Sequence, residues 1–265
     1  MQKCPAPTTP HQLGSERTSP VPATACVRIA MWSGPRTVST ALMRAWENRS
    51  DCAVWDEPLY PWWLMHTGME HPGRDEVLLH HKGDLNLATL TARLAESPSP
   101  ILYQKHMSHH LLPEVPREWM EGARHAFLVR NPSRMLASLA AKIPNATLQD
   151  TGLPQQVELL RWLDDQGHPA PVVIDSDDVL ASPRSILSSL CKSLMVPFDE
   201  KMLSWPAGSR QSDGAWAPYW YDSVVASTGF GPPANTLAMV PERQQAILPA
   251  CEDLYDELAA LRLRP

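Results

Sequence analysis

Five short apolar runs, separated by segments with helical periodicity, constrain the fold of this 265-residue chain more than any other feature. A run of four to seven mostly apolar residues is typical of a strand that is buried on both faces. Such strands are buried by helices that cover both faces of a parallel sheet. The pattern therefore predicts an α/β fold with a parallel sheet flanked by helices. The runs cover residues 26–32, 52–55, 101–104, 125–129 and 171–175.

The predicted domain begins where the apolar residues begin. Residues 1–25 are rich in Pro, Ser and Thr and offer little to bury, so we expect a disordered leader. Residues 26–265 are then a single α/β domain. Within it, residues 205–236 are rich in Trp, Tyr, Gly and Pro and predict an irregular C-terminal cap. A final helix is expected to carry one apolar stripe, formed by Cys251, Leu254, Leu258 and Leu261.

Composition excludes several classes of protein. The chain has 23 basic and 29 acidic residues, a net charge of −6, which argues against a nucleic-acid partner. It has no run of 18 apolar residues and no signal-peptide pattern, so we expect no membrane association. Five scattered cysteines without a CxxC pair indicate reduced thiols in a cytoplasmic protein, and no metal is expected. The sequence leaves the oligomeric state open.

Residues 33–40, with the sequence SGPRTVST, join the first predicted strand to its helix. Backbone N–H groups and the positive end of the helix converge at such a junction, which suits a phosphate. The segment is not a Walker A loop, because the second Gly and the Lys are missing. A helix start capped by Ser and Thr explains it equally well. The candidate phosphate ligands are Ser33, Gly34, Pro35, Arg36, Thr37, Ser39 and Thr40.

A second candidate anion site lies at the end of the fourth predicted strand. Arg130 ends that strand, and Ser138 lies two turns into the following helix. Ligands of open α/β sheets bind outside the carboxyl ends of the strands, so both side chains can meet an anion there. The alternative is a surface Arg and a surface Ser without a ligand.

Titratable side chains follow the second and third predicted strands. Lys105 and His106 are candidates for charge stabilisation and general-base chemistry. Glu57, in an Asp-Glu-Pro segment, is a second candidate base, although a carboxylate there can also cap the next helix. His109 and His110 are best explained as structural histidines, since no metal-ligand pattern accompanies them.

Together these segments resemble the sulfotransferases that use adenosine 3′-phosphate 5′-phosphosulfate (PAPS). Residues 33–40 resemble their 5′-phosphosulfate loop, and Arg130-Asn131-Pro132 with Ser138 resembles their 3′-phosphate motif. Residues 105–113 resemble the Lys-Thr-His…Leu-Leu-Pro segment of the cytosolic enzymes, which aligns His106 with their catalytic histidine. The Asp-Glu-Pro segment at residues 56–58 resembles the Gly-Glu-Pro of bacterial carbohydrate sulfotransferases.

The sequence SGPRTVSTALMRAWENR resembles most closely a bacterial sulfotransferase-like family that is sometimes labelled branched-chain aminotransferase-like. The resemblance covers about residues 26–200 and continues through residues 216–230. It departs from the cytosolic enzymes at Arg36, which takes the approximate place of their loop lysine, and at residues 210–216, a loose counterpart of their Arg-Lys-Gly-x-x-Gly segment. No lysine stands in a setting typical of pyridoxal phosphate.

The resemblance implies a P-loop-type parallel sheet and a PAPS-dependent sulfotransferase that produces adenosine 3′,5′-bisphosphate and sulfates a hydroxyl of a small acceptor. It assigns Arg36 to the 5′-phosphosulfate and Arg130 with Ser138 to the 3′-phosphate. Either Glu57 or His106 is then the base, and Lys105 assists the bridging oxygen. The alternatives are a P-loop small-molecule kinase and a nucleotide-binding protein without activity.

Aromatic residues flank the expected site and indicate the chemical class of the acceptor. Such side chains stack on sugar faces and surround ammonium groups, which favours a sugar-like polyol or an amino alcohol. Packing of the aromatic residues in the core is the simpler explanation. They are Trp62, Trp63, Trp216, Tyr219, Trp220 and Tyr221.

Overall fold

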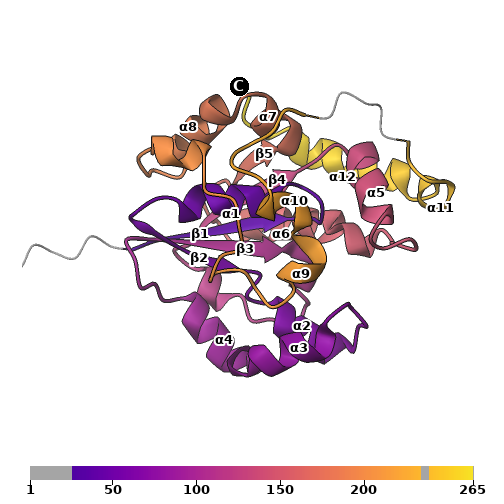
Figure 1. Cartoon of the computed structure of the whole chain (residues 1–265), viewed down its shortest axis with the longest axis horizontal. Coiled ribbons are helices and arrows are strands. Elements are labelled where there is room, and N and C mark those ends of the chain that lie inside the picture. Colours follow the sequence, from indigo (N-terminus) through magenta and orange to yellow (C-terminus); the bar gives the residue numbers. More distant parts are fainter. Residues whose placement is uncertain (1–25, 234–238, 265) are drawn as a thin grey trace, which may run out of the picture.

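The computed structural model describes residues 26–233 and 239–264 (Figure 1). Its centre is a five-stranded sheet in which every pairing is parallel, with the strand order β2-β3-β1-β4-β5. The predicted α/β fold with a parallel sheet is therefore confirmed, whereas the predicted leader lies outside the described residues. The strands are β1 (Val27–Ser33), β2 (Cys52–Asp56), β3 (Ile101–Met107), β4 (Arg124–Val129) and β5 (Val172–Asp175).

Helices cover both faces of this sheet, as uniformly apolar strands require (Figure 1). Those between β1 and β3 are α1 (Ser39–Glu47), α2 (Tyr60–Thr67), α3 (Arg74–His80) and α4 (Leu87–Leu94). Those between β4 and the C-terminal cap are α5 (Pro132–Ala140), α6 (Leu153–Asp165), α7 (Ser176–Ala181) and α8 (Pro183–Ser193). The remaining helices are α9 (Ala217–Trp220), α10 (Asp222–Val225), α11 (Glu242–Gln245) and α12 (Leu248–Ala259).

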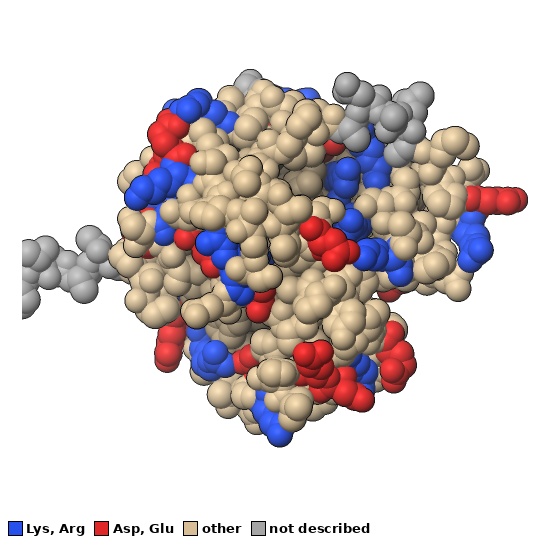
Figure 2. Space-filling view, viewed as in Figure 1, with Lys and Arg blue, Asp and Glu red and all other residues tan. Residues whose placement is uncertain are grey.

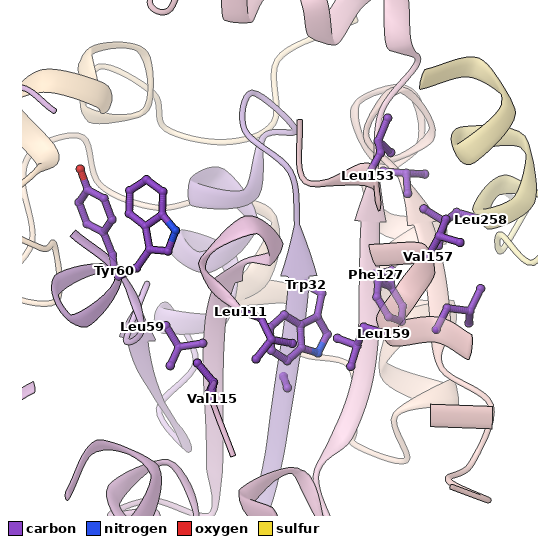
Figure 3. Packing of buried hydrophobic residues seen from close by; sticks show 14 of the residues in the cluster. Trp32, Leu59, Tyr60, Leu111, Val115, Phe127, Leu153, Val157, Leu159 and Leu258 are labelled. Atoms are coloured by element: carbon purple, nitrogen blue, oxygen red, sulfur yellow. The ribbon is translucent and has the colours of Figure 1, made fainter. Parts of the chain in front are cut away.

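Alternate residues of β1 belong to two separate hydrophobic cores. Ile29 and Met31 pack with residues of α1 and α8 on one face of the sheet. Trp32 packs on the other face with residues of α2, α4, α6 and α12, and Phe127 of β4 lies directly across from it. Figure 3 shows Trp32 and Phe127 with Leu159 beside them. The sheet is thus buried on both faces, and the carboxyl ends of its strands are left as the place where a site can form.

Three details differ from the sequence predictions. Strand β3 continues to Met107, so Lys105 and His106 lie inside the strand rather than after it. The polar end of β3 stays buried because its side chains find tertiary partners. The C-terminal cap contains the short helices α9 and α10. Leu261 lies beyond the end of α12 and is 54% exposed, so it does not extend the buried stripe.

Candidate active site

A cavity of about 410 Å³ lies at the carboxyl end of the sheet, where ligands of open α/β sheets bind. Its size is within the range of small-molecule sites, about 300–1,000 Å³. Residues 35–41 after β1, Glu57 after β2, Lys105 of β3 and Arg130 after β4 line one part of it. Figure 2 shows a hollow on this face of the molecule, with Lys and Arg side chains gathered along its edge.

The loop after β1 is held in a conformation that few side chains adopt. Arg36 and Val38 have φ values of 62° and 58°, both in the left-handed region. Ser176 of α7 donates a 2.7 Å hydrogen bond to the carbonyl oxygen of Thr37, and the Thr37 hydroxyl donates to Gly34. Because surrounding contacts hold these backbone angles, the loop is built before any ligand binds.

Gly34 allows the loop to pack against the segment before α6. A Cβ atom at Gly34 would lie 2.2 Å from the carbonyl oxygen of Thr151, so any side chain would displace the loop. Gly152, which has a φ of 73°, adjoins Gly34 on the same side. The glycine predicted as a phosphate ligand therefore serves as a close-packing point behind the loop, and it does not line the cavity.

Arg36 and Arg130 connect the two predicted anion motifs directly. A terminal nitrogen of Arg130 donates a 2.5 Å hydrogen bond to the carbonyl oxygen of Arg36. The Arg36 Nε in turn donates to the Ser138 hydroxyl on α5 at 3.0 Å. The loop after β1, the end of β4 and the first turns of α5 therefore form one basic cluster at the cavity. Ser138 itself supports Arg36 and is not part of the cavity lining.

The two arginines of this cluster are partly buried, and carboxylates act on both through their charge. Burial lowers the pKa of the Arg36 guanidinium, which Asp222 raises only in part. Burial also lowers the pKa of Arg130; Asp177 and Asp175 oppose this effect, whereas the positive charges of Arg134 and Arg36 add to it. The Nε atom of Arg130 is buried and has no hydrogen-bond partner within the described chain. A buried donor without a partner beside a second guanidinium fits a doubly or multiply charged anion such as a phosphate.

A second cluster lies across the cavity at the ends of β2 and β3. The Lys105 ammonium donates to the Asp56 carboxylate at 2.8 Å, to Glu57 Oε1 at 2.5 Å and to the Tyr221 hydroxyl at 2.7 Å. Asp56 and Lys105 occupy paired positions on neighbouring strands, which explains their proximity. Burial opposes the charge on Lys105, but the two carboxylates outweigh it and raise the pKa of this lysine. All three Lys105 hydrogens are used inside the cluster, so none is left for a bridging oxygen.

Glu57 has the properties of a buried base. It is 9% exposed, lines the cavity, and has a φ of 41° that is fixed by a 2.9 Å bond from its N–H to the Lys105 carbonyl oxygen. Burial raises the pKa of the Glu57 carboxyl above its ordinary value, and the Lys105 charge opposes that rise. Its Oε1 atom accepts from Lys105, whereas Oε2 has no hydrogen-bond partner among the described residues. A carboxylate with one oxygen held and one free can accept a proton.

His106 lies away from the cavity. Successive side chains of a strand point to opposite faces, so Lys105 and His106 cannot both face the same space. The His106 ring stacks on Trp32 with the ring centres 4.4 Å apart, and it is 1% exposed. Burial lowers the pKa of His106 to about 3. Of the two candidate bases, only Glu57 lines the cavity.

Of the remaining predicted phosphate ligands, some line the cavity and one does not. Pro35, Thr37, Ser39 and Thr40 line the cavity. Ser33 does not, because its hydroxyl is buried at the end of β1 and donates to the carbonyl oxygen of His106 at 3.1 Å.

No cluster of three or more potential metal ligands occurs in the described part of the chain. Within residues 26–233 and 239–264, no helix has the length and apolar character to cross a bilayer.

Aromatic and imidazole rings form the wall of the cavity near Glu57. Of the predicted aromatic set, Trp62 and Tyr219 lie outside the lining. His109 and His110, which were predicted to be structural, line the cavity, and the Nδ1 atom of each is buried with no hydrogen-bond partner in the described part of the chain. Tyr60, His71 and Asp150 were missed because nothing local distinguishes them from other polar or aromatic residues of helices and loops. The lining rings from the predicted set are Trp63, Trp216, Trp220 and Tyr221.

Solved structures similar to this chain include sulfotransferases. The sulfotransferase domain of the Synechococcus PCC 7002 olefin synthase superposes with a TM-score of 0.54 at 17% identity, covering 90% of this chain and 97% of that one. A sulfotransferase from Alicyclobacillus acidocaldarius gives a TM-score of 0.52 at 13% identity, covering 91% and 97%. At these identities the likeness concerns the fold.

Sequence comparison identifies the family. Branched-chain-amino-acid aminotransferase-like proteins 2 and 1 of Arabidopsis thaliana are 36% and 37% identical to this chain over 230 residues. The match covers 87% of this chain and 41% of each relative, so the chain spans about two fifths of their length. A family model described as the sulfotransferase domain matches residues 27–261. The chain therefore belongs to the sulfotransferase domain family.

Proposed function

We propose that this protein is a PAPS-dependent sulfotransferase that sulfates a hydroxyl of a small acceptor. The observation that carries the proposal is that Arg36 and Arg130, joined by a hydrogen bond from the Arg130 guanidinium to the Arg36 carbonyl oxygen, line one cavity with the buried carboxylate of Glu57. Two cationic groups suit the two phosphate-bearing ends of PAPS, and the carboxylate suits a hydroxyl that must lose a proton. Family membership supports the same donor.

PAPS supplies the sulfuryl group, whose sulfur bonds to the acceptor oxygen as its bond to the bridging phosphate oxygen breaks. In this scheme Arg36 and the N–H groups of residues 37–40 hold the 5′-phosphosulfate. Arg130, whose Nε is free, holds the 3′-phosphate, and Ser138 positions Arg36. Glu57 Oε2 accepts the acceptor proton. Sulfuryl transfer needs little else, because positioning and charge stabilisation account for most of the catalysis.

Glu57 is the favoured base because His106 is packed against Trp32 and Trp119 in the core. The pKa of His106, lowered to about 3 by burial, also leaves it a weak proton acceptor at neutral pH. The role of Lys105 in this proposal is to hold Glu57 and Asp56, since its three hydrogens are already donated.

A kinase is the main competing function. A P-loop kinase binds ATP with a loop lysine and with Mg²⁺ held partly by a carboxylate. The loop lacks the lysine, and Asp56 already accepts hydrogen bonds from Lys105, from Tyr221 and from the Gly214 N–H. These contacts favour the sulfotransferase.

The acceptor that we propose is a polyol or an amino alcohol. Trp63, Trp220 and Tyr221 offer aromatic surface at the cavity, and the carboxylates of Glu57 and Asp150 offer hydrogen-bond acceptors. Burial lowers the pKa of His109 to about 4, so its neutral ring can both donate and accept at pH 7. Hydroxyl groups match this mixture of rings, carboxylates and a neutral imidazole.

Calorimetry with three nucleotides tests the donor assignment. Adenosine 3′,5′-bisphosphate is expected to bind tightly, and AMP and ATP–Mg²⁺ about 100-fold more weakly, because only the bisphosphate satisfies both guanidiniums. Transfer of radiolabelled sulfate from PAPS to a panel of polyols and amino alcohols then tests turnover. Preferred binding of ATP–Mg²⁺ would favour the kinase, and bisphosphate binding without turnover of any acceptor would favour a non-catalytic protein.

A further inference from the structure

Tyr221 of the C-terminal cap is the central member of the cluster that holds Glu57. Its hydroxyl lies 2.7 Å from Lys105 Nζ, 3.0 Å from the indole nitrogen of Trp216 and 2.7 Å from Asp56 Oδ2. Lys105 and the indole are donors only, so the hydroxyl accepts from both and donates its hydrogen to Asp56. The hydroxyl therefore uses its full hydrogen-bonding capacity inside the cluster.

The Lys105 ammonium also donates all of its hydrogens within the cluster. Its ammonium has three hydrogens, and Asp56, Glu57 and Tyr221 accept one each. The ammonium also lies 5.0 Å from the centre of the Tyr221 ring. Lys105 and Tyr221 are 1% and 4% exposed. Because every hydrogen of the Lys105 ammonium and of the Tyr221 hydroxyl is donated inside the cluster, a rotation of either side chain would leave a buried donor unpaired.

Contacts of Gly214 and Trp216 in the C-terminal cap hold Tyr221 in this position. Gly214 donates its N–H to Asp56 Oδ2 at 3.2 Å. A Cβ atom at Gly214 would lie 2.1 Å from the Trp216 ring, so only glycine allows that ring to pack where it does. Trp216 is 1% exposed and supports the Tyr221 hydroxyl. These contacts join a segment more than 100 residues downstream to the ends of β2 and β3.

We infer that Tyr221 is a positioning residue for the proposed base. By occupying the third hydrogen of Lys105 and holding Asp56, it fixes Lys105 on Glu57 Oε1 and leaves Oε2 directed to the acceptor. The inference rests on the proposed function for its catalytic meaning, although the coupling between Tyr221 and Glu57 can be measured without any substrate.

Removal of the Tyr221 hydroxyl is expected to change the Glu57 pKa in one direction. The ionisable groups in contact with Glu57 are Lys105, Asp56 and Tyr221, and Tyr60 also interacts with its charge. Burial and Asp56 raise the pKa of the Glu57 carboxyl, whereas Lys105 and the Tyr221 hydroxyl lower it. Tyr221→Phe takes one acceptor from Lys105 and frees its ammonium, whose charge lowers the Glu57 pKa, to move away from Oε1. The Glu57 pKa is therefore expected to rise.

Carbon NMR of glutamate carboxyls in the full chain tests the coupling. The Glu57 signal is identified by its loss in Glu57→Gln, and its titration midpoint is compared in the wild type, in Tyr221→Phe and in Tyr219→Phe. Tyr219 is the matched control, because it lies in the adjacent helix α9 outside the cavity and its hydroxyl is 3.5 Å from Glu76. The expected result is a midpoint at least half a pH unit higher in Tyr221→Phe only. Equal midpoints in all three proteins would overturn the inference.

A second measurement keeps the test valid should Tyr221→Phe fail to fold, which thermal unfolding detects. A chain with 3-fluorotyrosine at position 221 retains the hydroxyl, and its fluorine signal is expected to shift with pH at the Glu57 midpoint. The step should vanish when Glu57→Gln is added, and a signal without the step would contradict the coupling.

Adenosine 3′,5′-bisphosphate binding separates this inference from the proposed function. We expect Tyr221→Phe to bind the bisphosphate within about twofold of the wild type, because Tyr221 contacts neither arginine. Failure of the wild type to bind the bisphosphate would overturn the proposed function. Normal binding with an unmoved Glu57 midpoint would overturn only the role of Tyr221.

Discussion

Arg130 donates a 2.5 Å hydrogen bond to the backbone carbonyl of Arg36, so the end of β4 holds the loop that follows β1. The two residues are 94 positions apart, and each belongs to a different predicted anion motif. Their contact makes one basic unit from two segments. Within this unit Arg130 supports the Arg36 backbone, and Ser138 in turn holds the Arg36 side chain.

Arg130→Ala is expected to weaken adenosine 3′,5′-bisphosphate binding by about 2–3 kcal/mol, the scale of a lost charge-assisted hydrogen bond with its Coulomb energy. AMP binding should fall less, because AMP lacks the 3′-phosphate. Calorimetry with both nucleotides measures the difference. Arg161→Ala is the control, since that exposed arginine pairs with Glu257. Wild-type protein that binds AMP as tightly as the bisphosphate would refute the 3′-phosphate assignment.

Arg36→Ala is expected to slow sulfuryl transfer by roughly two to three orders of magnitude, as loss of a group that stabilises transition-state charge does. Ser138→Ala, which frees the Arg36 side chain but keeps its charge, should cost less than Arg36→Ala. Rates with labelled PAPS at saturating acceptor test this order. An Arg36→Ala enzyme with wild-type rates would assign the charge role to another residue.

Gly34→Ala is expected to disrupt the loop after β1, because the new Cβ would lie 2.2 Å from the Thr151 carbonyl oxygen. Bisphosphate binding should weaken at least tenfold and the melting temperature should fall. Gly83→Ala is the matched control, since a Cβ atom there has no neighbour within 4 Å. Both changes are followed by calorimetry and thermal unfolding. Equal behaviour of the two variants would mean that the loop adjusts without cost.

The sheet was predictable because buried parallel strands appear in the sequence as apolar runs. The predicted end of β3 was wrong because its polar residues are buried by partners distant in sequence. Lys105, for example, donates to the Asp56 carboxylate at 2.8 Å, across 49 positions of the chain. Strand periodicity also carries information that the apolar runs alone do not, since it directs Lys105 and His106 to opposite faces.

Residues of the candidate site that follow strands could be identified from their positions, because carboxyl ends of parallel strands meet at one edge. Tyr221 could be named as an aromatic near the site, but its pairing with Lys105 spans 116 positions and has no local signal. The same holds for Gly34, whose role depends on the approach of Thr151. Such contacts are set by the packing of the whole domain.

Glu57→Gln is expected to abolish transfer while bisphosphate binding is kept, because the amide cannot accept the acceptor proton. In the wild type, kcat/KM should rise with pH through a pKa above the ordinary glutamate value, since the base acts only when deprotonated and burial raises its pKa. His106→Asn should keep this pH profile. Profiles measured from pH 4 to 9 test both variants. Full activity of Glu57→Gln would exclude Glu57 as the base.

Trp220→Ala is expected to raise the acceptor KM more than it lowers kcat, which is the mark of an interaction made equally in the ground state and the transition state. Trp220 lines the cavity near His71, with the ring centres 6.0 Å apart. Tyr219→Ala changes the neighbouring residue of α9 outside the lining and should leave KM unchanged. Steady-state kinetics with polyols, amino alcohols and phenols measure the effect. Because rings of this kind cover sugar faces and surround ammonium groups, a phenol that is turned over far better than either class would contradict the proposed acceptor.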